Sequence, residues 1–168
     1  FFRILELEIN KKIFEPLLEY INLNNLDDLV AEIGKESESR KTQKVKEYWF
    51  RTLKQIKSML SSGKGFELGF AEILLGKCSS TKGPDSALKS SFFDAFTKVL
   101  NAHGVRALEN GRLRKMIGVE ARESYRNPPA HCRYIDFSVA RECRLHVERA
   151  LQDLILYTDD TKPRHGTV

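Results

Sequence analysis

Arg126, Asn127 and His131 are the residues of this sequence best suited to chemistry on a phosphate group. A histidine with a pKa near its ordinary value of about 6.5 can accept or donate a proton at neutral pH. An arginine can hold a phosphate through two hydrogen bonds and stabilise the charge that grows on it in a transition state. An asparagine can orient a hydroxyl group or the arginine itself. Together these side chains could surround one anion.

Pro128 and Pro129 decide whether the three side chains can meet. On a continuous helix, the spacing of Arg126 and His131 would place them about 140° apart, on different faces. Asn127 precedes a proline, and the residue before a proline avoids the helical conformation. We therefore expect the helix to stop there and the chain to turn, which brings His131 back towards Arg126. This set suits the cleavage of RNA, whose 2′-hydroxyl supplies the nucleophile, so we expect no metal and no other cofactor.

The segment from Tyr125 to His131 resembles the motif of the HEPN superfamily, in which an arginine is followed at short spacing by a histidine, often with a polar residue directly after the arginine. The place of the motif before a long final helix is also similar, and the similarity extends over residues 108–158. The resemblance assigns catalysis to Arg126 and His131 and a supporting role to Asn127.

The resemblance also implies an activity and an assembly. It implies a metal-independent endoribonuclease that cleaves single-stranded RNA, leaves 2′,3′-cyclic phosphate ends and works as a homodimer with one composite active site. It points to a toxin or an antiviral-defence system. The alternative is a non-catalytic HEPN module that dimerises or binds RNA or another ligand within a larger protein. The paired prolines depart from the usual motif and are compatible with a rigid site or with an inactive descendant.

Residues that flank the motif could contact RNA. Arg122 and Arg133 could bind its backbone, and Tyr125 and Tyr134 could stack on its bases. The competing interpretation is structural, with the arginines on a solvated helix face and the tyrosines packed in the bundle. Further cations of this region could extend a positive rim: Arg112, Arg114, Lys115, Arg141 and Arg144.

His131, Cys132, Cys143 and His146 raise the question of a zinc site. Cys143 and His146 lie one helical turn apart, which is a workable ligand spacing. However, Cys143 falls on the predicted apolar stripe of the final helix, where a cysteine behaves as a small hydrophobic residue, so we expect no metal here. The chain contains three cysteines: Cys78, Cys132 and Cys143. This small and odd number argues against a disulfide framework and favours a reducing, cytoplasmic compartment.

Length, charge and periodicity predict the fold. The 168 residues suit one helical domain, and the net charge of +5 fits RNA as a partner but is also common for solubility alone. No apolar run has the length of a membrane span. The chain opens with Phe1 in sequence typical of a chain interior, so we expect it to be part of a larger protein with other domains or a regulatory partner.

The spacing of apolar residues predicts an all-α, HEPN-like bundle of about five to seven helices. The first ten residues fit either a strand or a helix, and the break at Asn22–Asn25 allows one or two helices before Gly34. The final helix should bury a stripe of Ala140, Cys143, Val147, Ala150, Leu151 and Leu154. One further helix should end near Leu60. Two others should cover about residues 66–75 and 86–100, and an unbroken helix should cover residues 107–127.

Overall fold

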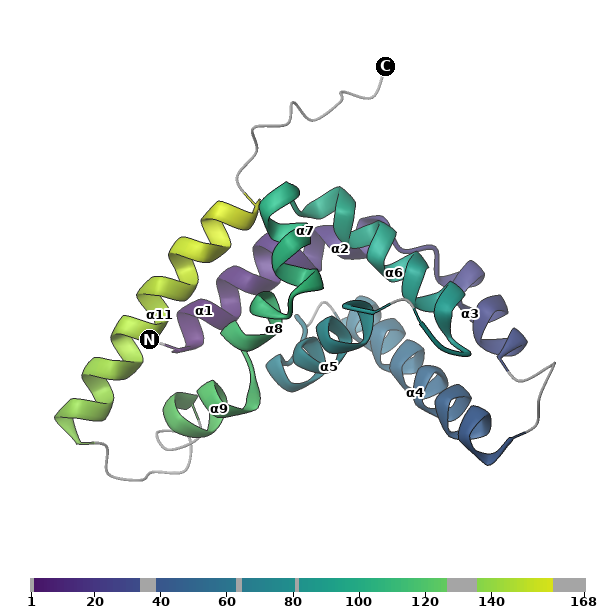
Figure 1. Ribbon diagram of the computed structural model, residues 1–168, viewed down its shortest axis with the longest axis horizontal. Helices are drawn as coiled ribbons and strands as arrows, with labels where there is room; N and C mark the ends of the chain where they lie inside the picture. Colours follow the sequence, from purple (N-terminus) through teal and green to yellow (C-terminus); the bar gives the residue numbers. More distant parts are fainter. Residues whose placement is uncertain (1, 34–38, 63–64, 81, 127–135, 159–168) are drawn as a thin grey trace, which may run out of the picture.

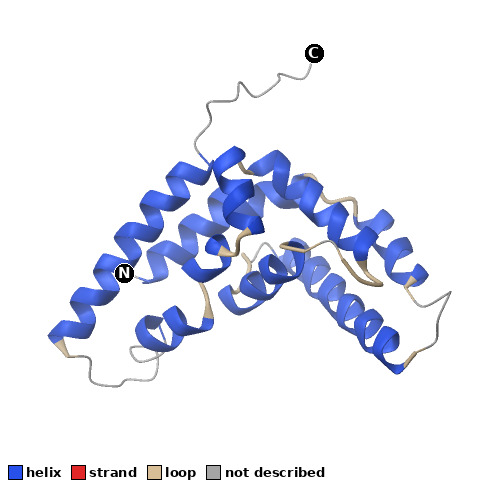
Figure 2. Cartoon of the chain, viewed as in Figure 1, coloured by secondary structure: helices blue, strands red, loops and turns tan. Residues whose placement is uncertain are grey.

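The computed structural model describes residues 2–33, 39–62, 65–80, 82–126 and 136–158, apart from the side chains of Asn24, Tyr125 and Arg126. Every regular element in these ranges is a helix, which confirms the predicted all-α bundle (Figure 2). The helices are slightly more numerous than expected from the sequence.

The N-terminal segment is helical and contains no strand. α1 (Phe2–Ile9) continues through the π-helical turn η1 (Asn10–Phe14) into α2 (Glu15–Glu19). Pro16 lies just after the wider turn, and its ring and missing N–H disfavour regular α-helical geometry in the turn before it. Within η1, the Asn10 side chain accepts a hydrogen bond from the Phe66 N–H at 2.6 Å and donates one to the Phe66 carbonyl at 3.0 Å.

α3 (Leu23–Glu32) and α4 (Arg40–Ser62) pack against each other at one end of the molecule. The predicted break before α3 is confirmed, because the Asn22 side chain accepts a hydrogen bond from the Asn25 N–H at 3.2 Å and caps the helix. In α4, the fully buried Trp49 stacks on Phe92 with ring centroids 5.5 Å apart. This contact attaches α4 to the core.

α5 (Leu68–Cys78) and α6 (Ser86–Val99) follow and pack against each other. Asp85 precedes α6, but its buried carboxylate makes no capping bond. It accepts a hydrogen bond from Trp49 Nε1 at 2.7 Å and pairs with Lys89 at 2.9 Å. Burial raises the pKa of Asp85, but the hydrogen bonds from Trp49 and Lys89 and the Lys89 charge outweigh it and leave the pKa below its ordinary value.

The unbroken helix predicted over residues 107–127 is wrong. The chain instead forms a succession of short helices: α7 (Ala102–Glu109), α8 (Arg112–Met116), α9 (Val119–Ala121) and the π-helical η2 (Arg122–Arg126). Gly111 adopts φ 74° and Gly118 is extended, so neither can continue a helix. The apolar residues spaced along this stretch are buried all the same: Leu108, Leu113, Ile117 and Ala121.

α11 (Phe137–Thr158) is the long final helix that the sequence predicts, and it packs against α1 and α7. Cys143, Val147, Ala150 and Leu154 are buried along it, as expected, and Leu151 is half-buried. The prediction is wrong for Ala140, which is exposed because the first turn of α11 is largely exposed. Together the helices form an arch, with α11 at one end, α3 and α4 at the other, and α5 beneath the centre (Figure 1). None of the helices in the described ranges combines the length and the apolar character that a membrane span requires.

The close approach of α7 to α11 generates a stability prediction. A Cβ at Gly104 would lie 2.6 Å from the Tyr157 carbonyl oxygen, a backbone atom that cannot rotate away. Helix propensity favours alanine by at most about 1 kcal/mol, whereas overpacking costs about 1–3 kcal/mol. We expect Gly104→Ala to lower the free energy of unfolding by about 1–2 kcal/mol in urea titrations followed by circular dichroism.

Gly118→Ala is the matched control. A Cβ at Gly118 would meet its nearest neighbour, the Arg114 carbonyl oxygen, at an ordinary 3.5 Å, and the φ of −62° suits alanine. Its effect should stay within about 0.5 kcal/mol. Equal stabilities for the Gly104 variant and the wild-type protein would show that α7 and α11 do not lie this close.

Candidate functional site

The described helices hold both ends of the segment that carries the predicted motif. Arg126 is the last residue of η2, and α11 begins at Phe137. η2 packs against α11 and also against α1. The helices at the two ends of the motif segment are therefore packed together (Figure 1).

The central residues of the prediction fall between these ends. Asn127, His131, Arg133 and Tyr134 lie outside the described residues, as do the side chains of Tyr125 and Arg126. Their predicted roles stay predictions. What the structure adds is the way in which the neighbouring helices are positioned.

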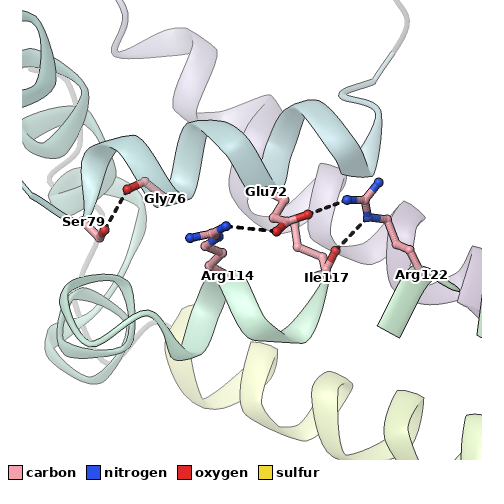
Figure 3. Close-up of polar contacts among 6 residues, drawn as sticks. All are labelled: Glu72, Gly76, Ser79, Arg114, Ile117 and Arg122. Carbon is pink, nitrogen blue, oxygen red and sulfur yellow. Dashed lines mark hydrogen bonds and ion pairs between the residues drawn. The ribbon is translucent and has the colours of Figure 1, made fainter. Parts of the chain in front are cut away.

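Arg122, which the sequence suggests as an RNA contact, is engaged inside the protein. Its Nη2 donates to Oε2 of Glu72 on α5, and its Nε donates to the Ile117 carbonyl at 3.3 Å (Figure 3). Its side chain is 23% exposed, and the guanidinium spans from α5 to the turn before α9. Arg122 therefore ties the start of η2 to α5, four residues before Arg126.

Glu72 is the residue of this region that the sequence analysis missed. Its side chain is 9% exposed, and its second carboxylate oxygen accepts a hydrogen bond from Nη2 of Arg114 at 3.3 Å (Figure 3). A buried carboxylate is costly unless charged partners satisfy it. Here two arginines, one from α8 and one from η2, satisfy it together. The signal in the sequence was a lone acidic residue within the apolar stretch from Leu68 to Leu75.

Two glycines of α5 make room for these arginines. A Cβ at Gly69 would lie 3.0 Å from Nη1 of Arg122, and a Cβ at Gly76 would lie 3.2 Å from the Arg114 side chain. The glycines flank Glu72 at positions three before and four after it, so they share its face of the helix. Each arginine therefore crosses α5 over a glycine on its way to the carboxylate.

Asp136 lies at the other end of the motif segment, directly before α11. Its carboxylate accepts a hydrogen bond from the Ser138 N–H at 2.6 Å and so caps α11. The hydrogen bonds from Ser138 hold the pKa of Asp136 below its ordinary value. The cap therefore contributes stability above the ordinary pKa of an aspartate, and the contribution is lost as the pH falls through the lowered value.

The pair considered as zinc ligands has structural contacts. His146 Nε2 lies 3.1 Å from the Met116 carbonyl oxygen, and its ring stacks on Phe2 at 6.1 Å between centroids. Cys143 is buried, and burial raises the pKa of its thiol. Within the described residues, no group of three His, Cys, Asp or Glu side chains could hold a metal ion. Cys132 lies outside the described residues.

The predicted positive rim is partly neutralised. Arg114 pairs with Glu72, and Arg144 forms an exposed ion pair with Glu148 at 2.7 Å. The remaining described members of the rim are exposed: Arg112, Lys115 and Arg141.

Comparisons with known proteins do not assign the chain to a family. A scan against models of protein families, a search of curated proteins and a search of solved structures each found no match. The assignment of the candidate site therefore rests on its own residues and on the helices that hold them.

The buried ion pairs generate a prediction for stability. Glu72→Gln keeps the shape of the side chain but leaves the Arg122 and Arg114 guanidiniums without a carboxylate. Removing one partner of a buried charged hydrogen bond costs about 1–3 kcal/mol, and Arg114 is half exposed, which moderates the loss. We expect a decrease of about 1–2 kcal/mol in the free energy of unfolding, measured by urea titration.

Glu148→Gln is the matched control, because it removes the same charge from an exposed pair on α11. Exposed pairs of this kind contribute little, so no measurable change is expected. Equal effects of the two substitutions would contradict a role for Glu72 in holding η2 against α5.

Proposed function

We propose that this chain is a metal-independent endoribonuclease of the HEPN type, with Arg126, Asn127 and His131 at its active site. The observation that carries the proposal is the run of residues 126–131, attached to two helices that pack against each other. The all-α fold and the long final helix support it. A toxin or antiviral-defence role, cytoplasmic location and homodimeric assembly belong to the same proposal.

The reaction uses only groups of the protein and of RNA. His131 accepts the proton of the 2′-hydroxyl, and the 2′-oxygen attacks the adjacent phosphorus. Arg126 stabilises the negative charge that develops on the phosphate oxygens. The bond from phosphorus to the 5′-oxygen breaks, and that oxygen takes up a proton as it leaves. The products are a 2′,3′-cyclic phosphate and a 5′-hydroxyl, and no water is consumed.

A homodimer supplies the second proton-transfer group. One imidazole that has just accepted a proton is not also positioned to protonate a leaving group on the opposite side of the phosphorus. Two motifs that face each other across a two-fold axis provide two histidines and two arginines. One histidine then acts as the base and the other as the acid.

Substitution of the motif residues tests the proposal. Arg126→Ala and His131→Ala should each lower the rate of cleavage of a labelled single-stranded RNA in EDTA by about 100-fold or more. His103→Ala and Arg149→Ala, which change exposed residues of α7 and α11, are the controls and should keep wild-type rates.

Three outcomes would count against the enzyme. Equal rates for the wild-type protein and both motif variants would exclude the assigned site. Loss of cleavage in EDTA with recovery in Mg²⁺ would exclude the metal-independent mechanism. RNA binding without any cleavage would favour the non-catalytic binding module instead.

A further inference from the structure

α4 holds the excess positive charge of the chain. It contains seven Lys or Arg residues and a single acidic residue, Glu47, which gives it a net charge of +6. The whole chain carries +5, so the residues outside α4 together carry −1. The net positive charge of the protein is therefore concentrated in this helix, and the charges of the other residues nearly cancel.

Four of these cations form a line on the exposed face of α4. Arg40, Lys44 and Arg51 recur at positions that share one face of a helix, and Lys54 lies one turn after Arg51. All four are exposed. With a rise of 1.5 Å per residue, the line extends for about 21 Å. The opposite face carries the buried residues of the helix: Thr42, Trp49, Thr52, Leu53, Ile56 and Met59.

Contacts with α3 leave this line free. Lys46 Nζ donates to the Ala31 carbonyl at 3.3 Å, and Lys57 pairs with Asp27, so these two lysines hold α4 to its neighbour. Lys44, Arg51 and Lys54 form no ion pair within the part of the chain that the structure describes. Their charges are available to an external anion.

Phe50 lies beside the line of cations. Its side chain is 66% exposed, and it precedes Arg51 directly and Lys54 by one turn. Single exposed hydrophobic residues are ordinary on protein surfaces. An exposed aromatic ring among unpaired cations is the combination that binds single-stranded nucleic acid, because the ring stacks on a base while the cations contact phosphates.

We propose that the basic face of α4, formed by Arg40, Lys44, Phe50, Arg51 and Lys54, binds single-stranded RNA. The cations contact successive phosphates, and Phe50 stacks on one unpaired base. A membrane surface is the poorer partner, because a membrane-bound amphipathic helix inserts its apolar face into lipid, whereas the apolar face of α4 is occupied by the core. The inference rests on the proposed function in taking RNA as the ligand.

The salt dependence of binding tests the role of the cations. The probe is a fluorescent oligouridine of about twelve nucleotides with 2′-O-methyl groups, which the proposed reaction cannot cleave, and fluorescence anisotropy reports its affinity. Affinity falls as salt rises, and each lost phosphate contact makes the slope of log affinity against log salt less steep by about 0.7. For the triple variant Lys44→Gln, Arg51→Gln, Lys54→Gln, the slope should therefore be less steep than for the wild type by about 2.

A second triple variant controls for net charge. Lys11→Gln, Arg106→Gln and Arg149→Gln remove three exposed cations from other helices. Between about 50 and about 200 mM salt, the affinity of this control should fall about 20-fold more than that of the α4 triple variant. Equal slopes for the two triple variants would overturn the proposal.

Two single positions separate specific contacts from a general attraction. Glu47→Gln removes the one negative charge of α4 and should tighten binding about twofold, because the carboxylate repels phosphate. Phe50→Ala should weaken binding about tenfold, Phe50→Leu should do the same, and Phe50→Trp should retain affinity. Full affinity in the leucine variant would contradict base stacking.

Binding and cleavage can fail separately. If the α4 triple variant binds the probe as the wild type does, the inference fails even where the Arg126 and His131 variants abolish cleavage. If the α4 variants lose binding and no cleavage occurs, the inference stands and the proposed enzyme fails. Unchanged RNA binding by the α4 triple variant, together with loss of binding to phosphatidylserine vesicles, would assign the basic face to a membrane.

Discussion

The buried carboxylate of Glu72 connects parts of the molecule that the chain alone leaves loosely joined. Residues 102–126 form short helical pieces interrupted by Gly111 and Gly118, and such pieces are marginal in isolation. Glu72 binds one piece through Arg114 and another through Arg122, so ion pairs join both to α5. Together with the packing of η2 against α11 and α1, this contact positions η2 and the backbone of Arg126.

The two proposals assign different tasks to the two ends of the arch. The motif segment is attached at the end formed by α9 and the start of α11 (Figure 1), where Asp136 caps α11. Arg122 connects this end to Glu72 on α5, which lies beneath the centre of the arch. α4 lies at the other end and carries the net positive charge. In this account, α4 supplies sequence-independent affinity for the RNA backbone, and the motif supplies the chemistry. Arg122 and Arg114, which lie near the motif in the sequence, pair with Glu72 inside the fold.

The sequence predicted the helical class and the core well, because burial leaves a periodic trace. The stripe of α11, with Cys143, Val147 and Leu154, and the cap at Asn22 were readable in this way. The unbroken helix over residues 107–127 was wrong because the apolar period persists across Gly111, although the backbone changes direction there. Periodicity records which residues are buried and does not record where a chain turns.

The sequence pattern could not predict ion pairs between residues far apart in the chain. Arg122 looked like a surface cation, since nothing local shows that Glu72, fifty residues earlier, receives it. Glu72 itself was detectable only as a lone charge in an apolar helix. The line of cations on α4 was visible as composition, but its exposure and the exposure of Phe50 required the packing of α3 and the core. The geometry of residues 127–135 lies outside the described residues.

The central claim is that the RNA supplies its own nucleophile to a site that contains no metal. The most direct measurement uses an RNA with a single 2′-deoxynucleotide at the main cleavage position, incubated with the wild-type protein in EDTA, with the ends of the products identified by mass spectrometry. The account predicts that cleavage stops at the modified position, continues at the unmodified ones and leaves 2′,3′-cyclic phosphates. Cleavage at the deoxynucleotide, or products that end in a 3′-hydroxyl, would contradict it.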